Sequence, residues 1–236
     1  MRRPQFARDL LRVLRLPGVT VALSGGPDAA AAYGNFTARH PRLFFIQKKR
    51  WGVALLALPP SFEAYLHGTS RQALRSNRKR CLSLGYTFRT IDPNSHLEQI
   101  LRINTSQKRR QGRDMDTPYV DREALHQYFS GERTTYGVLD SGSVLRAYAC
   151  APVYGEVFVL SRLLGEGDCL EQGIMYFLVS EIVREMIRER SQRGYPIWGM
   201  YDTYFGAQPG LRYFKDRLGF APHNVKWVWR SPTVSA

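Results

Sequence analysis

Side chains that could transfer a proton or bind an oxyanion follow a short apolar stretch, residues 197–201, near the end of the chain. Residues 200–206 read MYDTYFG. Because polar groups at the end of a central strand face the adjoining loop, Asp202 is a candidate to accept a proton from an attacking amine, or to hold a substrate amine. Tyr201 and Tyr204 are candidate donors to a developing oxyanion. The structural alternatives are a turn or capping role for Asp202 and burial in the core for either tyrosine.

A basic pair, Arg212 and Lys215, follows in the segment GLRYFKDRLGF, residues 210–220. A spacing of three places both side chains on one face of the helix that this segment predicts. The compact charge of Lys215 is suited to neutralise a carbonyl oxygen or a phosphate. The alternative is an exposed lysine beside Asp216.

Positive charge is concentrated in one part of the chain. The protein has 34 Lys and Arg against 20 Asp and Glu, a net charge of +14 and a pI near 10.0. Residues 71–113 contain eleven basic and two acidic residues, so +9 of the excess lies in this window. The basic residues include two groups: Arg71, Arg75, Arg78, Lys79 and Arg80, followed by Lys108, Arg109, Arg110 and Arg113. Such groups attract polyanions, tRNA among them; an acidic carrier protein and two merely solvated faces are the alternatives.

Cysteine and histidine spacing argues against a metal site and a disulfide framework. The three cysteines, Cys81, Cys150 and Cys169, are far apart, and the five histidines form no metal-binding pattern. Cys150 lies in an apolar stretch and Cys169 has acidic neighbours, so a covalent acyl-cysteine is disfavoured. We predict no metal and a reducing, cytoplasmic location. The longest apolar run, residues 51–60, is well short of the roughly 20 residues that a membrane span needs.

Hydrophobic periodicity predicts a mixed α/β fold. Residues 1–17 predict a basic amphipathic helix, packed on a single domain that covers residues 18–236; a transit peptide and a membrane-surface helix are the alternatives for this segment. Strands are predicted at residues 19–23, 43–47, 51–58, 86–91, 136–139, 144–152, 157–163, 197–201 and 225–229, and helices at 61–66, 70–84, 97–111, 123–129, 174–190 and 210–218. This order predicts a mixed, largely antiparallel sheet with helices on both faces.

The element order resembles the core of the GNAT acyltransferases, and two segments are similar to segments of the Fem-like aminoacyltransferases. One is the basic stretch SRQALRSNRKRCLSLGY, residues 70–86, and the other is FKDRLGF, residues 214–220. The resemblance covers residues 60–230. It implies a GNAT-like fold and an aminoacyl group taken from charged tRNA, and it places Lys215 near the reaction centre.

The GNAT resemblance also implies an alternative donor. GNAT enzymes that use acetyl-CoA carry a (Q/R)xxGx(G/A) loop before the long helix, where free backbone amides and the helix dipole bind the pyrophosphate. Residues 162–167, RLLGEG, match this pattern, so Arg162, Gly165 and Gly167 are candidate acyl-CoA contacts. The acidic Glu166 and Asp168 oppose a pyrophosphate, and a plain strand-to-helix loop is the alternative.

We therefore predict an acyltransferase that forms an amide bond on a small substrate amine. The charge window and the Fem-like segments favour aminoacyl-tRNA as donor, with peptide or cyclodipeptide products and no cofactor. Acetyl-CoA or another acyl-CoA is the alternative donor. A non-catalytic RNA- or lipid-binding module on a GNAT scaffold is the alternative of another class, because fold does not determine function. The amino acid, the acceptor and the oligomeric state do not follow from the sequence.

Overall fold

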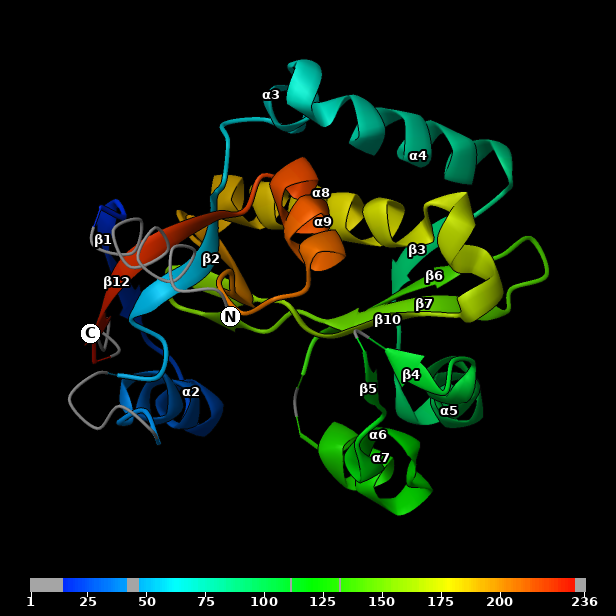
Figure 1. Cartoon of the computed structure of the whole chain (residues 1–236), viewed down its shortest axis with the longest axis horizontal. Coiled ribbons are helices and arrows are strands. Elements are labelled where there is room, and N and C mark those ends of the chain that lie inside the picture. Colours follow the sequence, from blue (N-terminus) through cyan, green and yellow to red (C-terminus); the bar gives the residue numbers. More distant parts are fainter. Residues whose placement is uncertain (1–14, 42–46, 111, 132, 232–236) are drawn as a thin grey trace, which may run out of the picture. The chain divides into compact units, whose positions relative to one another are not determined.

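The computed structural model describes residues 15–41, 47–110, 112–131 and 133–231, and their contacts group into two compact units (Figure 1). Unit 1 comprises the chain up to Leu58, Val153–Val159 and Glu189 onward, and unit 2 comprises Pro59–Pro152 and Leu160–Arg188. Residues 1–14 of the predicted N-terminal helix and most of the predicted strand 43–47 lie outside the described residues. The single domain expected from residue 18 onward stays a prediction.

Unit 1 is built on a six-stranded sheet with the order β1-β12-β2-β11-β9-β8. β1 pairs in parallel with β12, and β11 in parallel with β9, whereas the other pairs are antiparallel, so the sheet is mixed as predicted. Its elements are β1 (Gly18–Leu23), α2 (Pro27–Thr37), β2 (Trp51–Ala57), β8 (Val153–Tyr154), β9 (Val157–Val159), β11 (Trp198–Thr203), α9 (Pro209–Leu218) and β12 (Ala221–Trp229).

The two faces of this sheet bury different helices. On one face, α2 packs Phe36 against Trp227, with ring centroids 4.9 Å apart, and Met200 belongs to the same core. Neighbouring strand residues point to opposite faces, and Tyr201 accordingly packs against Phe214 of α9. Gly199 of β11 lies so close to the ring of a neighbouring β9 residue that an added Cβ would lie 2.5 Å from it.

Unit 2 contains a four-stranded antiparallel sheet with the order β10-β7-β6-β3 and a two-stranded ribbon, β4-β5. Its first elements are α3 (Phe62–Leu66), η1 (Thr69–Arg71), α4 (Gln72–Ser83), β3 (Thr87–Thr90), η2 (Asn94–His96), α5 (Leu97–Thr105), β4 (Arg109–Arg110) and β5 (Arg113–Asp114). The later ones are α6 (Thr117–Val120), α7 (Arg122–Phe129), β6 (Thr135–Leu139), β7 (Leu145–Cys150), β10 (Ser161–Gly165), η3 (Gly167–Gln172) and α8 (Ile174–Arg193), whose last turns belong to unit 1.

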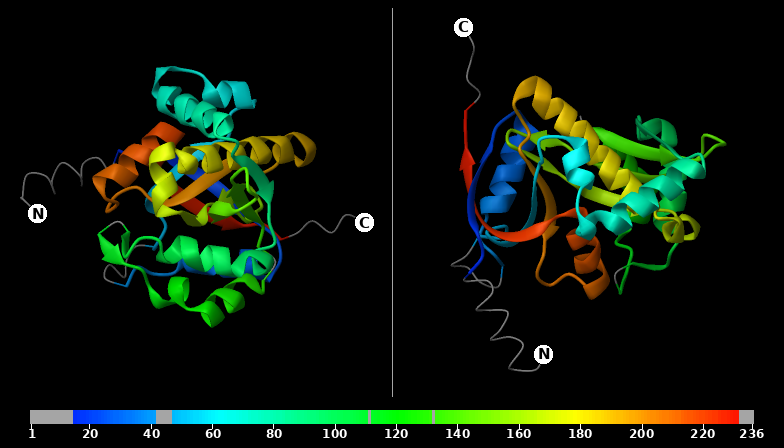
Figure 2. Two further views of the ribbon diagram at one scale, coloured as in Figure 1. Left: turned by 90° about the vertical axis from the view of Figure 1, so that its right-hand side faces the viewer. Right: turned by 90° about the horizontal axis from the view of Figure 1, so that it is seen from above.

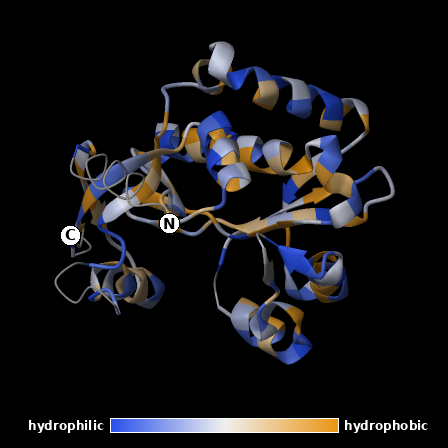
Figure 3. Cartoon of the chain, in the orientation of Figure 1, coloured by the Kyte–Doolittle hydropathy of each residue, from blue (hydrophilic) through white to orange (hydrophobic). Residues whose placement is uncertain are grey.

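Helices cover both faces of the four-stranded sheet. α8 lies on one face with α4 outside it, and α5, α6 and α7 lie on the other face (Figures 1 and 2). The core on the α5 side includes Tyr148 of β7, whose hydroxyl hydrogen bonds to the buried amide of Asn104 at 2.9 Å. In Figure 3, β6 and β7 consist largely of hydrophobic residues, whereas many residues of α4 are hydrophilic.

One predicted helix is shorter in the structure, and the long helix starts where it was predicted. The expected helix 97–111 ends at Thr105, because the hydroxyls of Thr105 and Ser106 bond back to carbonyls of α5 and the chain then turns into β4. The long helix begins at Ile174, as predicted, and extends to Arg193. Residues 167–172 form a separate 3₁₀ helix, and Gly173, with φ of 84°, breaks the chain before α8 starts at Ile174.

Candidate active site at the end of β11

A β-bulge shapes the end of β11. The register between β11 and β2 shifts between Met200 and Thr203, and within this shift Asp202 adopts a left-handed conformation with φ of 50°. A left-handed aspartate costs free energy that the surrounding structure must offset, and bulges with such residues are frequent at functional sites. The Asp202 carboxylate forms an ion pair with the ammonium of Lys49 and remains exposed over 61% of its side chain. Asp202 is therefore accessible and held in place from a second element.

Lys215 lies next to this bulge with its charge buried. The residue is only 1% exposed, and its Nζ donates a hydrogen bond to the Thr203 carbonyl at 2.7 Å. The same nitrogen lies 4.6 Å from the centroid of the Tyr201 ring. Within the described part of the chain, no carboxylate forms an ion pair with it. Lys215 is thus a buried cation whose partners are a carbonyl and a ring face.

Burial sets the acidity of this lysine. Removal from water disfavours the charged form and lowers the pKa of Lys215 from 10.5 to about 8; the positive charge of Lys49 adds to this effect, whereas Asp202 opposes it. At neutral pH the side chain is still mostly an ammonium. A positive charge in a site of low dielectric acts more strongly on a developing negative charge than it would in water.

The two candidate tyrosines have different surroundings. Tyr201 contacts Phe214 and Phe220 edge to face, and burial raises the pKa of its phenol well above its usual range. Its ring therefore serves to hold Lys215. The hydroxyl of Tyr204 donates to Asp216 of α9 at 2.7 Å, so an oxyanion would have to compete with that carboxylate.

The remaining basic candidate of this unit, Arg212, has a structural partner. Its Nε donates to the Ala207 carbonyl at 2.8 Å, which ties the start of α9 to the preceding loop. Lys49 is a site residue that the sequence analysis did not identify. It lies in the turn 48–50 before β2, 153 residues from Asp202, and its only sequence signal is the basic run KKR.

The first basic group of unit 2 lies at the N-terminal end and along the length of α4. Arg78 is committed to structure, because it forms an ion pair at 2.7 Å with Glu181 of α8, which is 1% exposed. Arg75 donates to the carbonyls of Leu66 and Gly68, and Arg80 to a carbonyl of η3, yet both remain exposed. Arg71 lies over the ring of Tyr65 and Lys79 is exposed.

The second basic group lies on the other side of the four-stranded sheet, beside α5 (Figures 1 and 2). Arg110 donates to the carbonyls of Ile103 and Gly165 at 2.7 and 2.9 Å, so it joins the end of α5 to the end of β10. Arg109 forms an ion pair with Asp114 at 3.4 Å, and Lys108 is exposed. The backbone of Arg113 in β5 pairs with that of Arg110 in β4. The two groups therefore do not form one continuous surface.

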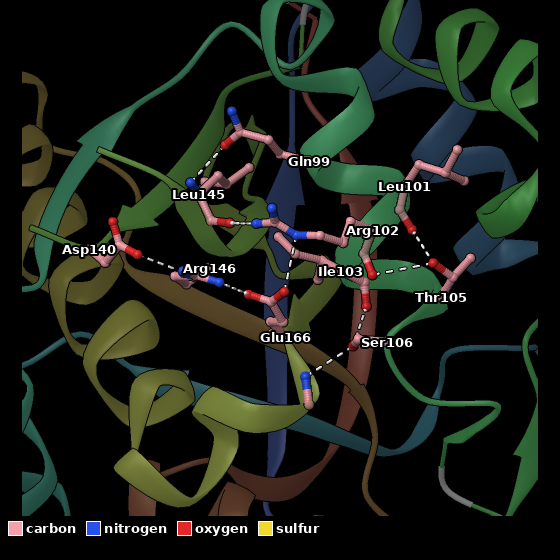
Figure 4. A network of polar contacts seen from close by, with 12 residues as sticks. Gln99, Leu101, Arg102, Ile103, Thr105, Ser106, Asp140, Leu145, Arg146 and Glu166 are labelled. Atoms are coloured by element: carbon pink, nitrogen blue, oxygen red, sulfur yellow. Dashed lines mark hydrogen bonds and ion pairs between the residues drawn. The ribbon is translucent and has the colours of Figure 1, made fainter. Parts of the chain in front are cut away.

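Two backbone amides of the glycine loop after β10 are occupied. The N–H of Glu166 donates to the Arg146 carbonyl at 2.8 Å, and the N–H of Gly167 donates to the hydroxyl of Ser106 at 2.9 Å. The Glu166 carboxylate is buried between Arg102 and Arg146, at 3.0 and 2.6 Å (Figure 4). This loop holds a carboxylate of its own where an acyl-CoA loop presents free amides to a pyrophosphate.

Arg162, the first residue of the RLLGEG motif, lies within β10 and is held among aromatic rings. It has a φ of 42°, and its guanidinium lies 3.5 Å from the Tyr128 centroid and 4.4 Å from the Tyr119 centroid. One of its terminal nitrogens donates to the Pro118 carbonyl at 3.0 Å. The guanidinium is therefore packed against α6 and α7.

A shallow polar pocket of about 410 Å³ lies at the start of α5 and contains none of the predicted site residues. Its walls include His96 and His126, and the guanidinium of Arg122 beside it is paired with Glu98. Among the described residues, no cluster of His, Cys, Asp or Glu side chains is arranged to hold a metal. All three cysteines are buried, and burial raises the pKa of Cys81 to about 11.

Within the described ranges, no helix combines the length and the apolar character needed to cross a bilayer. No protein-family model and no curated protein matches the sequence. Solved structures do match. The chain is similar to FemX (11% identity, TM-score 0.52, covering 73% of this chain and 59% of that one) and to L-PGS from Bacillus licheniformis (15% identity, TM-score 0.51, covering 72% and 56%). It is also similar to a conserved protein of unknown function from Bacteroides thetaiotaomicron VPI-5482 (14% identity, TM-score 0.51, covering 72% and 57%).

This chain thus covers between half and two thirds of the length of each of these three solved chains. At these identities the likeness shows the fold. It is the mixed-sheet α/β fold of the GNAT-like proteins, with similarity to a Fem protein, which confirms the predicted fold class and the predicted resemblance.

Proposed function

We propose that this protein is an acyltransferase that forms an amide bond on a small substrate amine, with aminoacyl-tRNA as the donor. The observation that carries the proposal is the buried ammonium of Lys215, beside the strained and accessible carboxylate of Asp202. The Fem-like segment around Lys215 and the fold shared with FemX support a transfer reaction of this class.

The reaction balances with groups that the site contains. The substrate amine attacks the ester carbonyl of the donor, a C–N bond forms, and negative charge develops on the carbonyl oxygen. Asp202 accepts the proton that the amine loses, and the field of the Lys215 ammonium stabilises the oxyanion. The C–O bond to the ribose then breaks, and the ribose oxygen takes up the proton, which releases the amide and the uncharged tRNA.

The tyrosine rings and Lys49 act on this pair indirectly. Tyr201 offers its ring face to the Lys215 ammonium, so it positions the charge. Lys49 forms an ion pair with the carboxylate of Asp202, whose backbone is left-handed, and so holds this side chain in place. Tyr204 is bonded to Asp216 and thereby fixes α9 to the loop after β11.

The donor is proposed from the exposed cations of α4. A guanidinium has five N–H donors, so Arg75 and Arg80 can bond to protein carbonyls and still donate to phosphates, and Lys79 is exposed between them. The occupied amides of the loop after β10 favour tRNA over acyl-CoA, because a pyrophosphate would have to displace the Ser106 bond and approach the buried Glu166.

The test is a transfer assay with tRNA charged with labelled amino acids, a panel of primary amines and amino acid amides, and free CoA or acetyl-CoA in parallel reactions. Amine-dependent release of labelled amide from tRNA, unaffected by CoA, would support the proposal. Product formed from acetyl-CoA and not from charged tRNA would show that acyl-CoA is the donor. A salt-sensitive tRNA complex without any product would show that the protein is an RNA-binding module and not an enzyme.

The matched variants are Lys215→Met and Lys226→Met. Lys226 is an exposed lysine of β12 in the same unit, so it controls for loss of net charge. We expect transfer to fall at least 100-fold in Lys215→Met, a typical effect of removing one oxyanion partner, and to stay within twofold in Lys226→Met. Equal activity of both variants would refute the role of Lys215.

A further inference from the structure

The outward face of α9 carries an exposed aromatic ring with a guanidinium stacked on it. Tyr213 is 53% exposed, more than any other large hydrophobic side chain in the described part of the chain. The guanidinium of Arg217, one helical turn further on, lies 4.8 Å from the centroid of the Tyr213 ring. The cation covers one face of the ring, so the exposed surface is the other face and the edge.

This face is positively charged and belongs to the helix that supplies the proposed catalytic lysine. Arg212 and Arg217 flank Tyr213, and the carboxylate of Asp216 is bonded to Tyr204. Tyr213 and Lys215 are two positions apart, which turns them to opposite sides of a helix about 10–12 Å across. A ligand that contacts Tyr213 and also approaches the site beside the buried Lys215 must therefore be a flexible strand that passes around the helix.

From this arrangement we propose that Tyr213 and Arg217 form a stacking site for an unpaired base near the 3′ end of the donor tRNA. The inference rests on the proposed function and names the part of the partner that α9 binds. A base stacks on the open face of Tyr213, and Arg217 donates to the adjoining phosphate while its plane supports the ring from behind. The terminal nucleotide, which bears the acyl ester, continues around α9 toward Lys215.

The chemistry of this face favours single-stranded nucleic acid over an apolar partner. A ring backed by a guanidinium and flanked by a second arginine matches the combination of stacking and phosphate contacts by which proteins bind unpaired strands. An apolar protein surface would supply no anion to the two arginines beside Tyr213, whereas a nucleic acid supplies phosphates. Tyr195, an exposed tyrosine of the same unit at 44%, has no guanidinium stacked on it among the described residues and is the matched control.

The test measures binding by fluorescence anisotropy for the full chain and the variants Tyr213→Ala, Tyr213→Phe and Tyr195→Ala. The probes are intact tRNA and the same tRNA with its unpaired 3′ nucleotides removed. We expect Tyr213→Ala to weaken binding of intact tRNA by about 5- to 150-fold, the range for loss of one stacked base. Tyr213→Phe and Tyr195→Ala should stay within twofold of wild type. The loss in Tyr213→Ala should disappear with truncated tRNA.

The outcomes separate this inference from the proposed function. Unchanged binding by Tyr213→Ala, with wild-type transfer intact, overturns the stacking site alone. An equal loss with intact and truncated tRNA also overturns it, because the contact is then not with the 3′ end. If the wild-type protein neither binds tRNA nor transfers from it, both proposals fail. Thermal unfolding of Tyr213→Ala should match wild type, since the ring is exposed.

Discussion

Replacement of Lys215 by methionine separates the electrostatic role of this side chain from a packing role. Methionine has a similar length and fills the same buried space, but it cannot carry a proton or donate to the Thr203 carbonyl. We expect Lys215→Met to lose activity without losing much stability. Most substitutions of buried residues lower stability, so a loss of activity with nearly unchanged stability would identify an electrostatic role for Lys215.

The magnitude follows from the lowered pKa. Because burial lowers the pKa of Lys215 from 10.5 to about 8, the folded protein holds the ammonium less favourably than the unfolded chain by about 3 kcal/mol. Methionine removes that cost at pH 7, while the unpaired Thr203 carbonyl costs about 1–3 kcal/mol. The two terms nearly cancel, so the free energy of unfolding of the variant should lie within about 2 kcal/mol of wild type.

The pH dependence provides the sharper measurement. Between pH 8 and pH 10.5 the unfolded chain keeps the Lys215 proton and the folded protein releases it, so unfolding takes up a proton and stability rises with pH. From pH 7 to pH 9.5 the wild type should gain about 2 kcal/mol relative to Lys215→Met, because other groups contribute equally to both. Urea unfolding at both pH values measures this difference, with Lys226→Met as the control that shows none.

Two results would refute the reasoning. A wild-type minus variant difference that is the same at pH 7 and pH 9.5 would mean that Lys215 keeps an ordinary pKa and is not a desolvated cation. Full transfer activity in Lys215→Met would mean that the ammonium does not act on the oxyanion. Wild-type activity should also fall as the pH rises through about 8, since the ammonium is lost there.

Asp202→Asn should lower the transfer rate by about 10²–10⁴-fold with unchanged tRNA affinity, measured in single-turnover assays; a normal rate would exclude the carboxylate as base. Arg78→Ala leaves the buried carboxylate of Glu181 with one arginine fewer and should cost about 3 kcal/mol in urea unfolding. Lys79→Ala should leave stability unchanged and reduce the slope of log K for tRNA binding against log salt concentration by about one. A loss of stability with an unchanged slope would show that Lys79 supports the fold and does not contact a phosphate. Gly199→Ala should destabilise unit 1 by about 1–3 kcal/mol, because the methyl has no space against the facing ring, and an unchanged melting temperature would contradict that packing.

The sequence determined the elements because their signals are local. The spacing of apolar residues in α8, Pro209 at the start of α9 and Gly219 after its end are read within a few residues, and the structure has these elements near their predicted bounds. The mixed sheet followed from the order of such elements, and the Fem-like resemblance followed from two segments, residues 70–86 and 214–220. The start of α8 was predicted, but the 3₁₀ helix of residues 167–172 before it was not; the left-handed Gly173, which lies against Asn77, separates the two helices.

The tertiary structure determined which basic residues support the fold and which remain exposed. In the sequence, Arg78, Lys79 and Arg110 have the same appearance as members of charged runs. The fold pairs Arg78 with a buried carboxylate, uses Arg110 to join α5 to β10, and leaves Lys79 in solvent. Which cation remains available depends on what packs opposite it, and that neighbour comes from a distant part of the chain.

The same holds for the candidate active site. Sequence alone indicated Asp202 and Lys215 by residue type, position and resemblance. The bulge that turns Asp202 outward, the ring beneath the Lys215 ammonium and the ion pair with Lys49 arise only when β2, β11 and α9 come together. Burial and electrostatic pairing depend on residues that are distant in the sequence. Local patterns therefore identify the reactive groups, whereas the packed structure determines their pKa values and their exposure.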